Sequence, residues 1–374
     1  MTITVNRQEF VNTLKDGGSM AGRSKTVPTL NYSRIIIKGD GSYSVSSSDG
    51  EVGIIKNGVL KGAEQDCSFC VQPKELADIL STIKDDEVSF NLKDGCIEVY
   101  HSKGDIVVPI LPSDDFIMPS YDGLDKSVNV PSTELYGCLK NARIYCGADE
   151  LRPTLTGVFV KFHGDSIMLA ASDAHKLYID AFKVKENFGD ERIELIIPNR
   201  AIKPIMDAIY SSQDVDIRFG GTSIQFSTGD TIVTSRLIVG KYPDVSRLVS
   251  NDHRYIISVN KTTLLESLSR TLLSANSSTK LLKFGINTSA EKLTIVSEDL
   301  GFNKRSQDVI AIGVEQAENE NFNIGVKGSS LIDCISSVDA EDVVFRFIDN
   351  KKAIQILDKE RESKKIILMP FVID

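Results

Sequence analysis

The segment Ser172-Asp173-Ala174-His175 contains the three residue types of a hydrolytic triad. In such a triad the serine attacks a carbonyl carbon, the histidine takes the serine's proton, and the acid orients the histidine. The three side chains must converge, whereas neighbouring side chains of an extended strand point to opposite faces of the sheet. A hydrolase centred on His175 is therefore one hypothesis, and a structural role at a strand end is the other.

Other segments with chemical potential lack what their chemistry requires. Cys67 and Cys70 form a C-x-x-C pair, but no second pair or nearby histidine completes a tetrahedral zinc site. The glycine-rich segment Gly39–Ser42 joins two strand-like segments instead of opening a helix, which argues against a phosphate cradle. We find no clustered carboxylates and no metal-ligand spacing. We therefore expect a protein that is not an enzyme and that uses no cofactor and no metal.

The elements that must position these residues form an internal repeat. Three helical patterns begin after Val5, Val130 and Val259, and each places an apolar residue five positions and a leucine nine positions after the valine. Polar residues that can cap a helix N-terminus stand at each start. The apolar residues are Phe10 and Leu14, Leu135 and Leu139, and Leu264 and Leu268.

A second helical pattern follows Val71, Ile197 and Val326, which lie 126 and 129 residues apart. Apolar residues follow at the same offsets in all three copies, and their i, i+3, i+4, i+7 spacing predicts one buried helix stripe. Pro204 lies inside the middle copy. Because an interior proline costs about 3 kcal/mol, that helix is expected to start late or to kink.

Alternating strands separated by turn residues follow each helix in the same order. An acid recurs near the end of the first hairpin, as Asp49, Asp173 and Asp299, so we interpret it as a structural acid that bonds turn amides. The pattern predicts an α+β protein of three repeated domains, each with two helices packed on antiparallel sheet. The expected boundaries are 1–124, 125–252 and 253–374.

Composition suggests a compartment and raises a question about partners. No apolar run is long enough to span a membrane, the start lacks a signal-peptide pattern, and the six cysteines lack disulfide-framework spacing, so we expect a cytoplasmic protein that contacts no membrane. The net charge of −9 argues at first sight against nucleic acid. Basic residues nevertheless recur at helix positions, as at Lys140 and Lys261.

Several segments together resemble the bacterial DNA polymerase III β subunit, the sliding clamp family: "RPTLTGVFV", "LAASDAHKL", "SRLIVGKYPDV" and "ILMPFVID". The resemblance covers residues 1–374. It implies that the three clamp-type domains form half of a closed ring, completed by a head-to-tail homodimer. Double-stranded DNA would pass through the ring without being read in sequence. An acidic outer surface would be screened from a basic lumen over the roughly 10 Å Debye length.

The resemblance also implies a hydrophobic groove between the second and third domains that binds short motifs. Its partners would be the DNA polymerase III catalytic subunit, the clamp loader and other clamp-motif proteins. The apolar segment Ile366–Ile373 would close the sheet and wall the groove. Residues carried over to the groove are Leu155, Ser172, Ala174, His175, Lys176, Leu177, Pro243, Arg247, Leu248, Ile367, Met369, Pro370, Phe371, Val372 and Ile373.

Two further sets of residues follow from the same resemblance. The DNA contacts would be Arg23, Lys74, Arg152 and Arg200, and the dimer contacts would be Ile106, Val108, Leu272 and Leu273. Ala174 stands where the family usually has glycine, and Phe371 is larger than the usual residue. An alternative of a different class is a repeat scaffold that binds peptides without encircling DNA.

Overall fold

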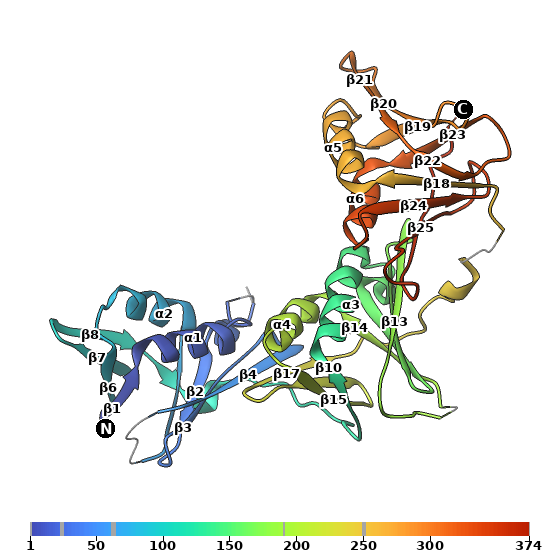
Figure 1. Cartoon of the computed structure of the whole chain (residues 1–374). Coiled ribbons are helices and arrows are strands. Elements are labelled where there is room, and N and C mark those ends of the chain that lie inside the picture. Colours follow the sequence, from blue (N-terminus) through green and yellow to red (C-terminus); the bar gives the residue numbers. More distant parts are fainter. Residues whose placement is uncertain (1, 23–25, 61–64, 190, 249–251, 374) are drawn as a thin grey trace. The chain divides into compact units, whose positions relative to one another are not determined.

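The computed structural model describes the chain except residues 1, 23–25, 61–64, 190, 249–251 and 374 (Figure 1). One order of elements occurs three times: strand, helix, four strands, helix, three strands. In the first repeat these elements are β1 (Thr2–Asn6), α1 (Arg7–Gly17), β2 (Ser33–Ile37), β3 (Ser42–Ser48), β4 (Val52–Val59), β5 (Cys67–Val71), α2 (Pro73–Thr82), β6 (Glu87–Lys93), β7 (Cys96–His101) and β8 (Gly104–Pro109).

The second and third repeats follow the same order. The second contains β10 (Lys126–Pro131), α3 (Ser132–Tyr145), β11 (Gly157–His163), β12 (Ser166–Ser172), β13 (Lys176–Lys183), β14 (Ile193–Pro198), α4 (Asn199–Ile209), β15 (Asp214–Gly220), β16 (Ser223–Ser227) and β17 (Thr231–Arg236). The third contains β18 (Tyr255–Asn260), α5 (Lys261–Leu272), β19 (Leu281–Asn287), β20 (Lys292–Asp299), β21 (Lys304–Ala311), β23 (Asn321–Lys327), α6 (Gly328–Ser336), β24 (Asp342–Phe347), β25 (Ile354–Leu357) and β26 (Lys365–Leu368).

Short elements lie between these repeating ones. They are the strands β9 (Leu111–Pro112) and β22 (Gly313–Gln316), and the 3-10 helices η1 (Pro28–Asn31), η2 (Ser113–Asp115), η3 (Pro153–Thr156) and η4 (Val245–Leu248). The prediction of three repeated α+β domains is confirmed. The boundaries at 124/125 and 252/253 stay predictions.

The chain divides into two compact units. The first contains Met1–Tyr136 and Arg200–Ile238, and its two antiparallel sheets have the strand orders β1-β6-β7-β8 and β10-β15-β16-β17-β4-β3-β2-β5-β9. The larger sheet crosses from the first repeat to the second where β4 pairs with β17. We call this strand pair the first seam.

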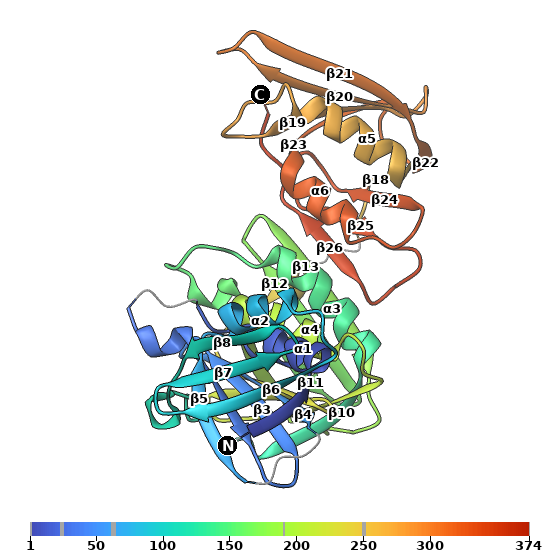
Figure 2. The same ribbon diagram turned by 90° about the vertical axis from the view of Figure 1, so that its left-hand side faces the viewer.

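The second unit contains Gly137–Asn199 and Val239–Asp374. Its sheets have the orders β14-β11-β12-β13-β26-β25-β24-β18-β22 and β21-β20-β19-β23. Here the larger sheet crosses from the second repeat to the third where β13 pairs with β26, which we call the second seam. Figure 2 shows α5 and α6 side by side against the strands of this unit.

The predicted apolar helix positions form the cores. All six residues expected on the first helices of the repeats, from Phe10 to Leu268, are buried. The Phe10 ring stacks on Tyr43 at 5.4 Å and meets the edge of Phe90 at 5.1 Å, which joins helix α1 to both sheets of the first unit. Each fully buried large apolar side chain contributes about 1.5–3 kcal/mol.

The late start expected for the second helix of the middle repeat is wrong, and so is a uniform capping of the first helices. Helix α4 begins at Asn199, two residues after Ile197, as α2 begins two residues after Val71, so Pro204 does not delay its start. Capping also differs among repeats. Asn6 and Asn260 accept hydrogen bonds from backbone amides at the starts of α1 and α5, but the buried Ser132 hydroxyl at the start of α3 makes no hydrogen bond to a described group.

Candidate functional site: an apolar groove beside the second seam

The turn between β12 and β13 is built by the recurring acid. The Asp173 carboxylate accepts hydrogen bonds from the amides of His175 and Lys176 at 2.9 and 2.8 Å, and the Ser172 hydroxyl donates to the Lys176 carbonyl at 2.9 Å. Asp49 and Asp299 make equivalent bonds to turn amides. The structural interpretation of this acid is confirmed. The Ser172 and Asp173 side chains bond backbone groups of the turn and not the His175 imidazole. This arrangement lacks the side-chain hydrogen bonds that a hydrolytic triad requires.

Ala174 has a φ of +74°, in the left-handed region that glycine adopts most readily. A residue with a β-carbon pays about 1–2 kcal/mol there. The turn therefore has a glycine-type backbone at an alanine. The adjacent His175 is exposed at the edge of the turn.

The two residues that follow point to opposite faces of the sheet. Lys176 is buried, forms an ion pair with Asp333 of α6 and lies 5.3 Å from the centre of the Tyr145 ring, so its side chain faces the helices. Leu177 is buried on the other face. Leu177 therefore shares a face of the sheet with Ile367, whereas the Lys176 ammonium does not. That both residues belong to a groove stays a prediction.

The apolar tail closes the sheet and then leaves it. Within β26, Ile367 is 2% exposed and lies directly opposite Leu177. The Met369 amide then donates to the His175 carbonyl at 2.8 Å, and the Phe371 amide donates to the Gly325 carbonyl at 2.8 Å. A β-carbon at Gly325 would lie 2.8 Å from the Phe371 carbonyl oxygen, so this close approach requires glycine.

Beyond β26 the tail presents apolar side chains to solvent. The exposed fractions are 39% for Met369, 38% for Phe371 and 69% for Val372, whereas Pro370 and Ile373 are partly buried. Contiguous exposed apolar side chains are typical of an interaction site. The expectation that the tail both closes the sheet and carries an exposed apolar wall agrees with these positions.

Two loops of the second unit supply the remaining groove residues. Leu155 is buried in η3, and its carbonyl accepts the Gly147 amide at 2.8 Å. In the other loop the Tyr242 ring stacks on Phe159 at 4.9 Å, while Pro243 is exposed and Leu248 is 46% exposed. Arg247 lies in η4, and its side chain is outside the described residues.

A buried polar network holds the segment that precedes the tail. Asp180 is 1% exposed and accepts hydrogen bonds from Arg361 (2.8 and 3.0 Å), Ser363 (2.8 Å) and Tyr178 (2.9 Å). Because Asp180 lies on β13 while Arg361 and Ser363 precede β26, these bonds fix β26 against the second repeat. Charge-assisted bonds of this kind are stronger than neutral ones.

A second buried pair fixes the other end of the same segment. The Lys364 ammonium donates to Asp358 at 2.7 Å and to the Ser337 carbonyl at 2.9 Å, and it also pairs with Asp339. Burial alone would raise the pKa of Asp358, but hydrogen bonds from the Asp339 amide and Lys364 hold it below its ordinary value of 3.8. Sequence reasoning missed this network because "DKERESKK" has the composition of a solvated loop.

The predicted DNA contacts are distributed over both units. Lys74 is exposed at the start of α2 and, with Lys15, lines a hollow of about 640 Å³. Arg200 is half exposed, with its nearest acid, Glu51, at 3.9 Å. Arg152 already forms an ion pair with Asp149 at 2.9 Å. Arg23 lies outside the described residues.

The predicted dimer contacts lie next to free sheet edges. Strand β8 is the last strand of its sheet, but Val108 is 1% exposed and Ile106 packs against the core, so both side chains point inward. Val107, which was not predicted, is an exposed apolar residue of this strand, at 58%. Leu273 is 81% exposed at the end of α5, and Leu272 is partly buried.

Three family models match successive parts of the chain. They are the DNA polymerase III beta subunit N-terminal domain over residues 1–121, its central domain over 129–244 and its C-terminal domain over 246–372. The chain belongs to the DNA polymerase III beta subunit family.

Relatives match over the full length at low identity. The beta sliding clamp of Caulobacter vibrioides is 23% identical, and that of Escherichia coli K12 is 20% identical, each over 99% of both chains. A crystal structure of the Pseudomonas aeruginosa DNA polymerase III subunit beta has a TM-score of 0.91 at 19% identity, with both chains fully covered. A DnaN sliding clamp from that species bound to griselimycin has a TM-score of 0.92 at 20% identity, again with full coverage of both chains.

Two sites considered from the sequence, a metal centre and a reactive cysteine pair, can be compared with the described residues of this beta subunit family member. No three His, Cys, Asp or Glu side chains in that part come together in a way that could hold a metal ion. Cys67 and Cys70 are free thiols on β5, and burial raises the pKa of Cys70 to about 11, which disfavours a reactive thiolate. None of the described helices has both the length and the apolar character needed to cross a membrane.

Proposed function

We propose that this chain is a DNA sliding clamp, a processivity factor without catalytic activity. Two copies associate head to tail into a ring around double-stranded DNA. The groove beside the second seam tethers the DNA polymerase III catalytic subunit, the clamp loader and other clamp-motif proteins. Family membership supports the class of function, and the geometry of the repeats supports the ring.

The observation that best supports a ring is that two strands, one in the first repeat and one in the third, lie at the ends of the described sheets with one edge unpaired. Within the chain, the strand that follows the first hairpin of one repeat pairs with the closing strand of the next, as β4 pairs with β17 and β13 with β26. The corresponding strands left at sheet ends are β21 of the third repeat and β8 of the first. A free edge offers unpaired N–H and C=O groups. Pairing β21 with β8 of a second copy would continue the same rule and close on twofold symmetry.

The repeat also predicts the register of this contact. The second seam places Leu177 opposite Ile367. Arg305 occupies the Leu177 position in β21, and Val107 occupies the Ile367 position in β8, so these two residues should lie opposite each other. Leu272 and Leu273 end the helix that packs on β20 and β21, next to this edge. In this register Ile106 and Val108 support the edge from the core side.

DNA would be held by enclosure with moderate phosphate contacts. Lys15, Lys74, Lys140, Arg143 and Arg200 are exposed on or next to helices of the first two repeats. In the third repeat Arg270 is engaged by Asp308 at 2.7 Å, and Lys261 donates to the Val338 carbonyl. A limited set of lysines and arginines gives weak, salt-sensitive and sequence-independent attraction, which suits sliding.

The register can be tested by cross-linking. Arg305→Cys combined with Val107→Cys should give a covalent dimer under oxidation, because directly opposed strand residues bring β-carbons within disulfide reach. Val309→Cys combined with Val107→Cys is the matched control, since it lies four residues out of register. Dimers from the control alone would contradict this pairing.

Encirclement can be tested separately from dimer formation. After treatment with a clamp loader, the protein should remain on nicked circular duplex and run off linear duplex of the same sequence. Equal retention on both would favour a peptide-binding scaffold that does not enclose DNA. Sedimentation should give the mass of two chains.

A further inference from the structure

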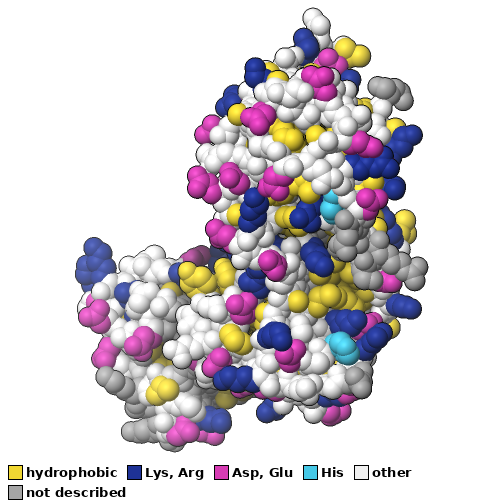
Figure 3. Space-filling view, turned by 45° about the vertical axis from the view of Figure 1, so that its right-hand side comes forward, with side chains coloured by type: hydrophobic (Ala, Val, Ile, Leu, Met, Phe, Trp, Pro, Cys, Tyr) yellow, Lys and Arg dark blue, Asp and Glu magenta, His cyan; other side chains and the backbone are white. Residues whose placement is uncertain are grey.

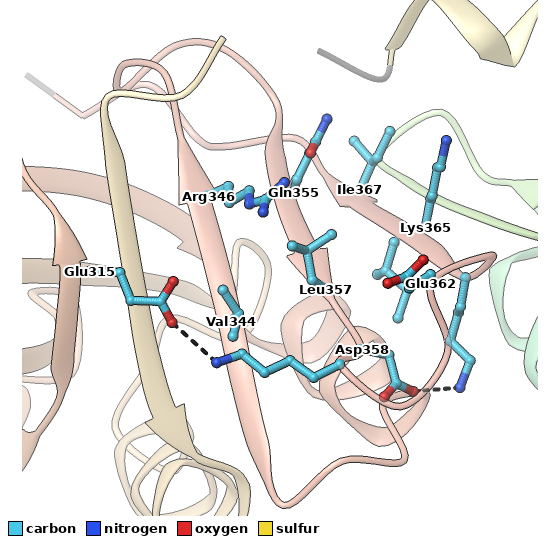
Figure 4. A pocket seen from close by; sticks show the side chains of 12 residues that line it. Glu315, Val344, Arg346, Gln355, Leu357, Asp358, Glu362, Lys365 and Ile367 are labelled. Carbon is cyan, nitrogen blue, oxygen red and sulfur yellow. Dashed lines mark hydrogen bonds and ion pairs between the residues drawn. The ribbon is translucent and has the colours of Figure 1, made fainter. Parts of the chain in front are cut away.

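Two hollows open on the outer face of the larger sheet in the second unit, the face that carries Ile367. One, of about 550 Å³, lies over β24, β25 and β26 (Figure 4). The other, of about 770 Å³, lies over β11, β12 and β13 beneath the loop containing Tyr242 and Pro243. Both are lined by Lys365 and Glu362, so they meet at the second seam.

The pairing of strands connects the first hollow to the groove. Directly opposed residues of antiparallel strands project from the same face. Leu177 lies opposite Ile367, Ile367 opposite Gln355, and Gln355 opposite Arg346. This row begins with two groove residues and ends inside the hollow, where Figure 4 shows Arg346 next to Gln355.

A neighbouring row on the same face contains Lys365. It lies opposite Ile179 on one side and Leu357 on the other, and Leu357 lies opposite Val344. The floor is therefore apolar on both sides of one exposed ammonium. Figure 3 shows apolar side chains interspersed with lysine and arginine side chains on the visible face of the second unit.

Within the described part of the chain, some charged side chains in the first hollow have ion-pair partners and others do not. Lys359 pairs with Glu315 at 3.1 Å, and Lys364 pairs with Asp358 at 2.7 Å. Among the described residues, the side chains of Arg346 and Lys365 have no hydrogen-bond or ion-pair partner, and the Arg346 Nε is buried. Buried polar groups without partners are rare in folded proteins, and a guanidinium is suited to grip a carboxylate with two parallel bonds.

We propose that Arg346 and Lys365 bind acidic side chains of the peptide segment that flanks the apolar anchors in the groove. This inference rests on the proposed function and adds a charge preference to it. Lys365 lies two residues from Ile367 along β26, about 7 Å away, and Arg346 lies two strands away, about 10 Å. An extended peptide advances about 3.3–3.6 Å per residue, so the acids stand two to three residues from the anchor.

We assign a peptide carboxylate as the occupant, because the ligand must contact the apolar floor and also pair with the side chains of Arg346 and Lys365. An apolar segment alone would leave Arg346 unpaired. A nucleic acid would meet Glu362 and Glu315 at the rim of the same hollow, and like charges facing an interface disfavour the wrong partner. An acidic peptide that spans only a few residues can reach the two cations and avoid the rim.

The test uses synthetic fluorescein-labelled dodecapeptides with one Leu and one Phe as anchors. Three glutamates or three glutamines flank the anchors, on either the N-terminal or the C-terminal side. Anisotropy titrations at about 0.1 M salt should give one glutamate peptide that binds about 3- to 10-fold tighter than its glutamine counterpart, as expected for one or two partly exposed ion pairs. The Arg346→Gln/Lys365→Gln variant should remove this ratio. Lys183→Gln, at an exposed lysine of β13, should preserve it.

Each outcome decides between the two proposals. If both peptides bind equally to the wild-type protein, or if the ratio survives in Arg346→Gln/Lys365→Gln, the charge preference is overturned and the groove is not. If neither peptide binds the wild-type protein, the groove fails and this inference fails with it. If the double variant unfolds, Lys365→Gln alone serves as the test. Lys365 is exposed, so this single variant keeps the fold, and it should remove part of the affinity ratio between the glutamate and glutamine peptides.

Discussion

The two seams follow the same rule of strand pairing but differ in the side chains that cover them. In each, a strand that follows a hairpin turn pairs antiparallel with the closing strand of the next repeat. In each, a backbone amide just past the paired residues then bonds the turn, Arg236 to the Glu51 carbonyl at 3.0 Å and Met369 to the His175 carbonyl at 2.8 Å. Backbone geometry therefore does not explain why the apolar residues that follow β26, such as Met369, are exposed.

The outer face explains the difference. Gly53 occupies in the first seam the position of Leu177 in the second. A β-carbon at Gly53 would lie 2.6 Å from the Met118 Cε and 2.7 Å from the Tyr121 hydroxyl. The chain's own linker therefore fills the first seam. In the second seam the corresponding linker packs Tyr242 on Phe159, and Met369 remains exposed.

The inner face differs as well. Asp180 and its partners tie the second seam with buried charge-assisted bonds, whereas the ion pair at the first seam, Lys56 with Asp230 at 2.8 Å, is partly exposed. An outer face that a linker does not cover lacks the stabilisation that packed linker side chains would supply. The buried network compensates by holding β26 in place while the outer face stays free.

The largest effect should come from Asp180→Ala. Breaking a buried ion pair leaves an uncompensated charge and typically costs about 3–5 kcal/mol, and the partial exposure of Arg361 places this case near the lower end. Urea unfolding should show the loss of stability. Asp165→Ala removes an exposed ion pair with Lys183 and should cost less than about 1 kcal/mol. Equal losses in both variants would mean that the network does not fix the second seam.

A smaller effect should follow when the second seam is copied into the first. Gly53→Leu should displace Met118 and Tyr121 and cost about 1–3 kcal/mol through overpacking. The linker at residues 113–121 should become more sensitive to limited proteolysis. Met118→Ala in the same chain should restore part of the stability. Gly229→Ala, which has open space around its β-carbon, is the control and should be nearly neutral.

The sequence predicted the repeat well because a repeat is visible as a constant spacing between apolar residues. The offsets from Val71, Ile197 and Val326 predicted three helices, and the recurrence of Asp49, Asp173 and Asp299 predicted turn acids. Local chemistry of this kind is carried by residues a few positions apart. Periodicity therefore defined the elements and one structural role.

What the sequence did not predict depends on pairs of residues distant in the chain. Nothing near Asp180 indicates that Arg361 will bond it, and nothing near Gly53 indicates Met118. The face of a side chain is also set by register, and the sequence did not show that the Lys176 ammonium points to the helices. A one-residue change of register reverses every side chain of a strand.

The groove itself offers the next test of the comparison. Met369→Ala combined with Phe371→Ala should weaken binding of a polymerase-tail peptide by more than about 1 kcal/mol, since a few apolar anchors carry most of the energy of such interfaces. Met118→Ala, which uncovers the first seam, should leave the affinity unchanged. Weaker binding in Met118→Ala, with no change in the tail variant, would move the partner site to the first seam.

The smallest effect concerns Arg200, a proposed DNA contact that lies beside the first seam. Its guanidinium lies 3.9 Å from Glu51, in the turn that corresponds to the His175 turn of the second seam. Arg200→Ala should lower the slope of log affinity against log salt by about one unit, as expected for the loss of one phosphate contact. Glu51→Gln should leave that slope at its original value or raise it, and should change stability by less than about 1 kcal/mol. An unaltered slope in Arg200→Ala would remove this residue from the DNA-facing surface and leave it a structural neighbour of the seam.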